Sequence, residues 1–154
     1  MYNIFMNDYQ TGGVSELKTC AKLLSLGYEV YRGIIQSPID ILIRSKDNQF
    51  VKIEVKKIVC KGKNTKYIRT SRAKTRVCNT TYKNDEVDFF VGVHEDSFYV
   101  VPYELALRNT KYGFTVSREN LERWDLLPEP FSYIEDKKND LQIVFPYLSE
   151  NFLK

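Results

Sequence analysis

The chain has 154 residues, 43% of them hydrophobic, which suits one ordinary domain with a real core and argues against global disorder. Three cysteines, Cys20, Cys60 and Cys78, match neither a disulfide framework nor a paired zinc motif, so we expect a reducing, cytoplasmic location. No apolar run approaches the roughly 20 residues of a membrane span, and the polar first ten residues lack the regions of a signal peptide. We therefore expect neither secretion nor a membrane partner.

Charge is distributed unevenly along the sequence. The net charge is only +3, but residues 55–84 contain ten Lys or Arg and no Asp or Glu, so the remainder of the chain is net acidic. The basic residues alternate with Tyr67, Tyr82, Thr and Ser rather than forming one block. This asymmetry favours a polyanion-binding surface on an acidic body. A mobile, solvated loop is the alternative interpretation.

The first predicted elements are a helix over residues 12–27 and a strand over residues 28–35. Four apolar residues recur along the helix at the spacing of one face: Val14, Leu17, Ala21 and Leu24. This spacing predicts that these side chains are buried, and Gly27 can end the helix. The strand is rich in β-branched and aromatic residues, and Gln-Ser-Pro ends it.

Residues 40–45 and 50–58 predict two strands of a hairpin joined by a polar turn. If their apolar residues share one buried face, the paired residue numbers must sum to an even value, about 94 to 96, which leaves a loop of three or five residues. Directly opposed residues share a face, so Asp40 then lies opposite or beside Glu54 and Lys56. The hairpin therefore predicts that two carboxylates and one ammonium converge.

The second half of the sequence predicts a further hairpin, from residues 87–93 and 97–102, which completes a mixed sheet of about five strands. Short helices are predicted over residues 103–109 and 117–127, the second with Leu121 and Trp124 at helical spacing. The apolar and aromatic segment 140–154 is expected to dock on the body or on another subunit. The fold class is therefore α/β, with a central sheet flanked by helices.

The converging charges suit phosphodiester hydrolysis. A divalent metal ion can neutralise the phosphate, activate water and stabilise the leaving alkoxide, and Mg²⁺ typically binds one or two carboxylates. Asp40 and Glu54 supply this pair, and the backbone carbonyl of Val55 could add a third oxygen. Lys56 could act on the attacking water or stabilise negative charge, and we favour the electrostatic and water-positioning role. Taken singly, Asp40 is typical of a turn, and Glu54 with Lys56 is typical of an exposed strand face with a weak ion pair. Glu16 taken alone is typical of a solvated glutamate on a helix.

Several stretches resemble the PD-(D/E)XK nuclease superfamily. "SPID" followed by "IEVKK" resembles its signature, and "GGVSELKTCAKLLSLGYEVYRG" resembles its leading helix and first strand. "EVDFFVGVHEDSFYVVPYE" resembles the last core strands of the small branch that contains intron-encoded homing endonucleases, and archaeal Holliday-junction resolvases are similar in size and core. The resemblance covers residues 10–105, and Ile39 departs from the literal proline–aspartate pair.

The resemblance implies a restriction-endonuclease-like core and a role for each acidic residue. Asp40 and Glu54 would be metal ligands, Lys56 the catalytic lysine, and Glu16 an accessory acidic residue. The expected cofactor is Mg²⁺, with Mn²⁺ as a substitute. We expect one nuclease domain over residues 1–154, with a core at 10–105 and an extension at 106–154 that serves oligomerisation or specificity.

The expected activity is site-specific cleavage of double-stranded DNA, of homing or restriction type. A junction resolvase and a non-catalytic DNA-binding module that kept the fold are the alternatives. Because cutting both strands needs two sites, a homodimer or homotetramer is expected. The residues expected to contact DNA are Lys57, Lys61, Lys63, Lys66, Arg69, Arg72, Lys74 and Arg76. The three arginines are also candidates for reading base edges.

Overall fold

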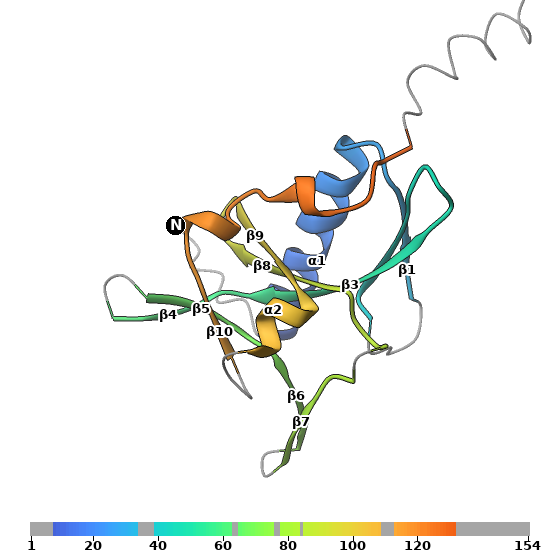
Figure 1. The fold of residues 1–154 in the computed structure, drawn as a ribbon. Helices are drawn as coiled ribbons and strands as arrows, with labels where there is room; N and C mark the ends of the chain where they lie inside the picture. The colour runs from blue at the N-terminus through green and yellow to red at the C-terminus, as the bar shows by residue number, and fades with distance from the viewer. Residues whose placement is uncertain are drawn as a thin grey trace, which may run out of the picture.

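The computed structural model has a mixed α/β fold (Figure 1). It describes residues 8–33, 39–62, 65–75, 78–83, 85–108 and 113–131. At its centre lies a five-stranded sheet in the order β1-β2-β3-β8-β9. The strands are β1 (Glu29–Arg32), β2 (Ile41–Arg44), β3 (Phe50–Lys57), β8 (Phe89–His94) and β9 (Ser97–Pro102). Neighbours are antiparallel except for β3 and β8, which are parallel, so the predicted mixed sheet of about five strands is confirmed.

Strands β2 and β3 form the predicted hairpin in the predicted register. Ile41 pairs with Ile53 and Ile43 with Val51, so the paired residue numbers sum to 94. The five residues 45–49 connect the two strands. In this loop Asn48 has a φ of 59°, a left-handed conformation that asparagine tolerates better than most residues. The apolar residues of both strands consequently share one buried face.

Helix α1 (Asp8–Ser25) ends as predicted but begins about one turn earlier. The N–H of Tyr28 donates to the carbonyl of Leu23 at 3.2 Å, and the N–H of Gly27 donates to the carbonyl of Leu24 at 3.0 Å. These two bonds form a Schellman motif, which requires a residue in the left-handed conformation just after the helix. Gly27 fills this position with a φ of 89°. Glycine at this position turns the chain into β1.

The prediction of which face of α1 is buried was wrong. Leu17 is 58% exposed and Leu24 59% exposed, whereas Ser15 and Thr19 are buried against the sheet. The hydroxyl of Ser15 donates to the carbonyl of Thr11 at 3.0 Å, and that of Thr19 donates to the carbonyl of Ser15 at 2.9 Å. Because these hydroxyls are satisfied within the helix, small polar side chains can be buried there. The helix therefore packs on the sheet through a face that combines apolar Cys20 and Leu23 with two small polar residues that hydropathy does not mark.

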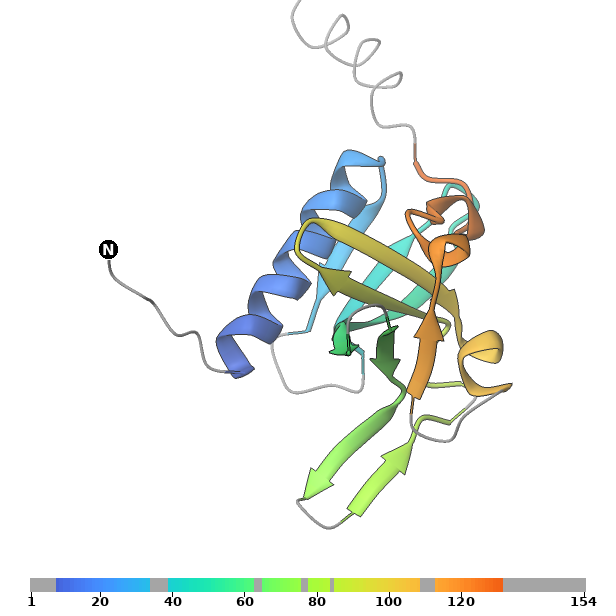
Figure 2. The same cartoon turned by 90° about the vertical axis from the view of Figure 1, so that its left-hand side faces the viewer.

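The two faces of the sheet carry separate hydrophobic clusters. Along β8 and β9 successive side chains alternate, so Val91 and Val100 pack toward α1 while Phe90 and Val101 pack on the opposite side. In the side view, α1 covers one face of the sheet (Figure 2). The short helix α2 (Tyr103–Arg108), which was predicted, packs beside the other face.

A second, three-stranded sheet covers part of the face opposite α1. Its strands, in the order β10-β5-β4, are β4 (Val59–Lys61), β5 (Thr65–Arg69) and β10 (Gly113–Val116). Ile68 of β5 is fully buried, and a Cβ at Gly92 of β8 would lie 2.8 Å from its side chain. Glycine at position 92 therefore permits close packing between the sheets. Strands β4 and β5 lie within the basic region, and none of the three strands was predicted.

The rest of the basic region forms a two-stranded ladder, β6 (Ser71–Thr75) with β7 (Cys78–Thr81). This ladder extends away from the central sheet (Figure 2). The described parts of residues 55–84 are thus mostly strands, so the solvated-loop interpretation of this region was wrong.

The prediction of a helix over residues 117–127 was also wrong. The structure has two short 3₁₀ turns instead, η1 (Arg118–Asn120) and η2 (Trp124–Leu126), separated by Glu122 with a φ of 52°. Leu121 forms a bridge with Tyr99 of β9, and Trp124 packs on Phe98 with ring centroids 5.5 Å apart. Contacts with β9 therefore override the local helical spacing.

Among the residues that the structure describes, no helix is long and apolar enough to cross a membrane. The segment 140–154, predicted to dock, lies outside the described residues.

Candidate active site

Asp40 and Glu54 face each other across the end of the β2–β3 hairpin. The register that pairs Ile41 with Ile53 places Asp40 opposite Glu54. The carboxylate of Asp40 is tied to β3, because the N–H of Val55 donates to its Oδ2 at 2.8 Å. The first carboxylate is therefore held by the strand that carries the second.

The carbonyl of Val55 points toward the same edge of β3. The pairing of β2 with β3 ends at Ile41, whereas β3 continues to Lys57. In an extended strand the N–H and the C=O of one residue face the same neighbour. Because the N–H of Val55 faces Asp40, its carbonyl oxygen faces that side as well. One strand edge thus combines a carboxylate with a main-chain oxygen.

Glu54 is 6% exposed and lies on the face opposite α1, paired in register with Phe90. Its Oε1 accepts two hydrogen bonds, from Lys56 Nζ at 2.5 Å and from the hydroxyl of Tyr82 at 2.5 Å. Its Oε2 is buried and has no hydrogen-bond partner in the described part of the chain. One carboxylate oxygen of Glu54 therefore accepts two hydrogen bonds and the other accepts none within the described part of the chain. An unsatisfied oxygen is costly for a buried charge.

Tyr82 was not predicted to belong to the site. It follows β7 and lies 28 residues from Glu54 in the sequence. Its alternation with basic residues predicts a place on a DNA-binding surface, but the side chain of Tyr82 is only 3% exposed. No local pattern marks it, because its hydroxyl reaches Glu54 only through tertiary packing, in which the Tyr82 ring lies against Phe90 of β8.

The electrostatic environment raises the pKa of three of these groups. For Asp40, burial and then the nearby charge of Glu54 raise the pKa to about 7, although the Val55 hydrogen bond opposes the shift. For Lys56, burial lowers the pKa but the charge of Glu54 and contact with Tyr82 outweigh it, so the net pKa is raised. Burial and the charge of Glu54 raise the pKa of Tyr82 to about 12. Lys56 is consequently an ammonium, and Tyr82 is a neutral donor at physiological pH.

Glu16 lies near the site but is engaged elsewhere. Its carboxylate forms an ion pair with Arg32 at the end of β1. It contributes a smaller upward effect on the pKa of Asp40 than burial or Glu54 does. The structure therefore brings Asp40, Glu54 and Lys56 together and places Glu16 beside them in a separate pair.

The donor set fits a hard divalent cation. No group of three or more His, Cys, Asp or Glu side chains that could hold a metal occurs among the described residues. Two carboxylates and one main-chain oxygen nevertheless suit Mg²⁺, which keeps water and substrate oxygens in the rest of its shell. The unsatisfied Oε2 of Glu54 and the raised pKa of Asp40 both indicate excess negative charge that a cation would offset.

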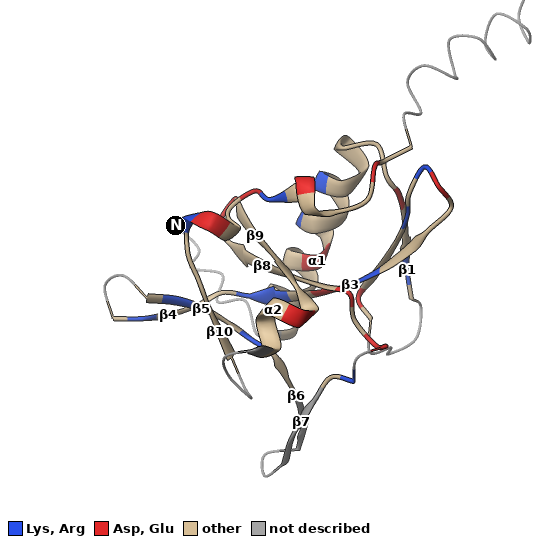
Figure 3. Cartoon of the chain, in the orientation of Figure 1, with Lys and Arg blue, Asp and Glu red and all other residues tan. Residues whose placement is uncertain are grey.

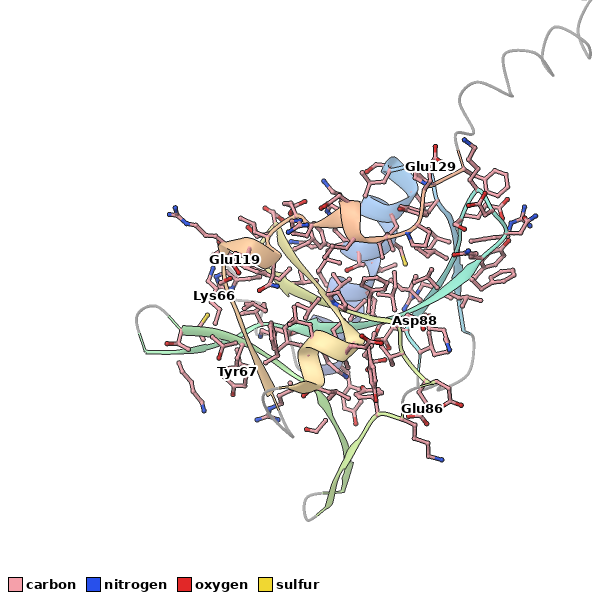
Figure 4. The ribbon with its side chains drawn as sticks, in the orientation of Figure 1. Lys66, Tyr67, Glu86, Asp88, Glu119 and Glu129 are labelled. Atoms are coloured by element: carbon pink, nitrogen blue, oxygen red, sulfur yellow. The ribbon has the colours of Figure 1, made fainter. Side chains whose placement is uncertain are left out.

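The predicted DNA contacts fall on more than one surface. Lys57 is exposed at the end of β3, and further Lys and Arg residues, coloured blue in Figure 3, follow along β4 and β5. On the outer face of β4 and β5, Lys61 Nζ lies 4.9 Å from the ring centroid of Tyr67, and exposed Arg69 shares the face of Tyr67 by strand alternation. Lys66, labelled with Tyr67 in Figure 4, belongs to the other face of β5. Its Nζ donates to the hydroxyl of Tyr99 at 3.2 Å.

The remaining predicted contacts are less fully described. Arg72 and Lys74 lie on β6, and nothing further is described of their side chains. Lys63 and Arg76 lie outside the described residues. The basic and aromatic face of Lys61, Tyr67 and Arg69 is therefore the part of the predicted surface that the structure defines.

The fold and this arrangement define a nuclease with the PD-(D/E)XK core. Residues 6–123 match the family described as PD-(D/E)XK endonuclease, and the chain belongs to that family. It is therefore a nuclease by class, with DNA as the implied substrate, and such nucleases generally use divalent metal ions.

A solved structure shares the fold. The bacterial homing endonuclease I-Ssp6803I superposes with a TM-score of 0.64 at 17% sequence identity, covering 90% of this chain and 96% of that one. At this identity the likeness concerns the fold, which confirms the predicted fold class. A search of curated proteins finds no significant match.

Proposed function

We propose that this protein is a Mg²⁺-dependent endonuclease that cuts double-stranded DNA at specific sites, in the manner of a homing or restriction enzyme. The observation that carries the proposal is the buried Oε2 of Glu54, which has no hydrogen-bond partner in the described part of the chain. It belongs to a carboxylate that also binds Lys56 and faces Asp40. A buried, half-satisfied carboxylate beside a second one is the expected state of a cation site before its ion binds.

In this proposal each site residue has one role. Asp40, Glu54 and the carbonyl of Val55 would hold the ion, which when bound would activate water and offset charge on the phosphate. The raised pKa of Lys56 favours an ammonium that stabilises negative charge and orients water over a general base. Glu16 would act as an accessory acid through its influence on Asp40, with Arg32 holding it in position.

The DNA backbone would lie along the basic strands that continue from β3. Lys61 and Arg69 can bind phosphates beside Tyr67, while Lys57 lies between this surface and the active site. The β6–β7 ladder, which carries Arg72 and Lys74, would extend the footprint away from the site. We retain Lys63 and Arg76 as proposed contacts from the sequence alone.

A homodimer or homotetramer would supply the two active sites needed for a double-strand break. The apolar side chains exposed along α1, including Leu17 and Leu24, support an interface with a second copy of this chain. We propose that the chain is one nuclease domain and that residues beyond 106 contribute to assembly or specificity.

Cleavage of defined DNA substrates tests the proposal. Purified protein is incubated with a randomised linear duplex library and with a four-way junction, in Mg²⁺, Mn²⁺ or EDTA, and the product ends are sequenced. The proposal predicts metal-dependent double-strand breaks at a recurring sequence in the linear library. Cutting confined to the junction would instead identify a resolvase, and binding without any cutting would identify a non-catalytic module.

A further inference from the structure

Contacts to its ring, its hydroxyl and its backbone carbonyl hold Tyr82 in place. Its ring meets Phe90 edge-on with centroids 5.3 Å apart, and its carbonyl accepts a hydrogen bond from the hydroxyl of Tyr103 at 2.9 Å. Its own hydroxyl donates to Oε1 of Glu54 at 2.5 Å. Because ring and backbone are both fixed, the direction of this hydroxyl is fixed as well.

The same oxygen of Glu54 also accepts a hydrogen bond from Lys56. The Nζ of Lys56 lies 2.5 Å from Oε1 and 5.5 Å from the centroid of the Tyr82 ring. Both donors thus bind one oxygen and leave Oε2 as the buried atom without a partner in the described part of the chain. A carboxylate held in this way has a fixed orientation and one oxygen directed to a further ligand.

We propose that Tyr82 is a positioning residue of the active site, whose hydroxyl holds Oε1 of Glu54 so that Oε2 can bind the metal ion and Lys56 can turn to the substrate. This inference rests on the proposed nuclease function. When Lys56 moves toward the phosphate, the hydroxyl of Tyr82 remains as the donor that satisfies Oε1. Without this hydroxyl, Lys56 would be the one remaining donor to Oε1 among the described residues, and the ion pair would resist opening.

This role differs from that of an ordinary buried tyrosine. Tyr28 offers the comparison, because it is 5% exposed and its hydroxyl donates to the carbonyl of Pro128 at 2.6 Å, in the cluster beneath α1. Either substitution to phenylalanine removes the hydroxyl of a buried tyrosine and its hydrogen bond to an acceptor oxygen. Only removal of the Tyr82 hydroxyl should alter the binding of metal.

The test compares Tyr82→Phe with Tyr28→Phe. Calorimetry with DNA-free protein measures Mg²⁺ affinity, and cleavage kinetics separate kcat from the KM for DNA. Tyr82→Phe should weaken Mg²⁺ binding by about 10- to 100-fold, the usual effect of losing a partner of a metal ligand, and lower kcat with KM unchanged. Tyr28→Phe should leave Mg²⁺ affinity and kcat within about 3-fold of the wild type, because its hydroxyl touches no proposed ligand.

A second measurement applies if Tyr82→Phe fails to fold. Tyrosine labelled with ¹³C at Cζ is incorporated at position 82 of the otherwise wild-type protein, and its NMR signal is followed during Mg²⁺ titration. A shift that saturates with the calorimetric binding curve supports the proposal, and a signal that does not move overturns it.

The outcomes separate this inference from the function on which it rests. Wild-type Mg²⁺ affinity and kcat in Tyr82→Phe would overturn the positioning role but not the nuclease function. An equal loss of Mg²⁺ affinity and kcat in Tyr28→Phe would do the same. Wild-type protein that neither binds Mg²⁺ nor cuts DNA would overturn both proposals.

Discussion

The backbone N–H of Val55 donates to Oδ2 of Asp40 at 2.8 Å, so the strand that carries Glu54 also sets the position of the first carboxylate. Asp40→Asn keeps an acceptor for this N–H but removes the charge proposed to bind metal. We expect cleavage to fall by about 1,000-fold, because metal stabilisation of the transition state is worth several kcal/mol. DNA affinity in EDTA should stay within about 3-fold of the wild-type value, as measured by fluorescence anisotropy.

Two further variants extend this test. Glu54→Ala and Lys56→Ala should each lose cleavage to a similar degree while retaining DNA binding, because both act in the transition state. Near-normal cleavage by any of these three variants would contradict the proposed site.

Stability should depend on pH through Asp40. The folded pKa of about 7 exceeds the ordinary value of 3.8, so the folded protein binds this proton more tightly than the unfolded chain does. The free energy of unfolding should therefore fall as pH rises from about 4 to about 7 and then level off, with a total loss of a few kcal/mol at most. Urea unfolding in EDTA across this range measures the effect.

The matched control for this pH dependence is Asp40→Asn, which cannot ionise. Its stability should exceed that of the wild type by an amount that grows up to about pH 7. Parallel stability curves for the two proteins would show that Asp40 does not titrate in this range.

Mg²⁺ should stabilise the protein more at high pH than at low pH. The ion and the proton compete for Asp40, whose pKa is raised to about 7 by burial and by Glu54. At a fixed Mg²⁺ concentration, the rise in the thermal unfolding midpoint over that in EDTA should be larger at pH 8 than at pH 5.5. A rise that is independent of pH would place the ion away from Asp40.

The two faces of β5 should contribute differently to DNA binding. Arg69→Ala should reduce the slope of log affinity against log salt by about 0.9, the value for one lost phosphate contact on duplex DNA. Lys66→Ala should change this slope less, because its ammonium binds Tyr99 on the other face. Equal slopes for Arg69→Ala and the wild type would remove this surface from the DNA footprint.

Assembly should depend on the exposed face of α1. Leu17 is 58% exposed, so Leu17→Glu should fold normally but shift the protein toward smaller species in sedimentation velocity. Leu105 of α2 is 37% exposed and offers a matched control, because Leu105→Glu introduces the same charge on another helix. If both variants sediment as the wild type does, α1 is not the interface.

The sequence by itself determined the central hairpin and the residues that meet at its end. Alternation of apolar residues in β2 and β3 allows only registers that bury them together, which place Asp40 opposite or beside Glu54 and Lys56. The structure adopts the register with a sum of 94, so Asp40 lies opposite Glu54. The positions of the five main strands along the chain, and the glycine that ends α1, follow from equally local signals. Such features are predictable because neighbours within a few residues decide them.

Tertiary structure alone decided which face of α1 is buried, how the basic region folds, and that Tyr82 joins the site. Ser15 and Thr19 are buried because their hydroxyls bond within the helix and their small size allows close packing, which hydropathy does not register. The hydroxyl of Tyr82 reaches Glu54 across 28 residues of chain. Contacts of this range depend on how separate elements pack, so no local sequence pattern can encode them.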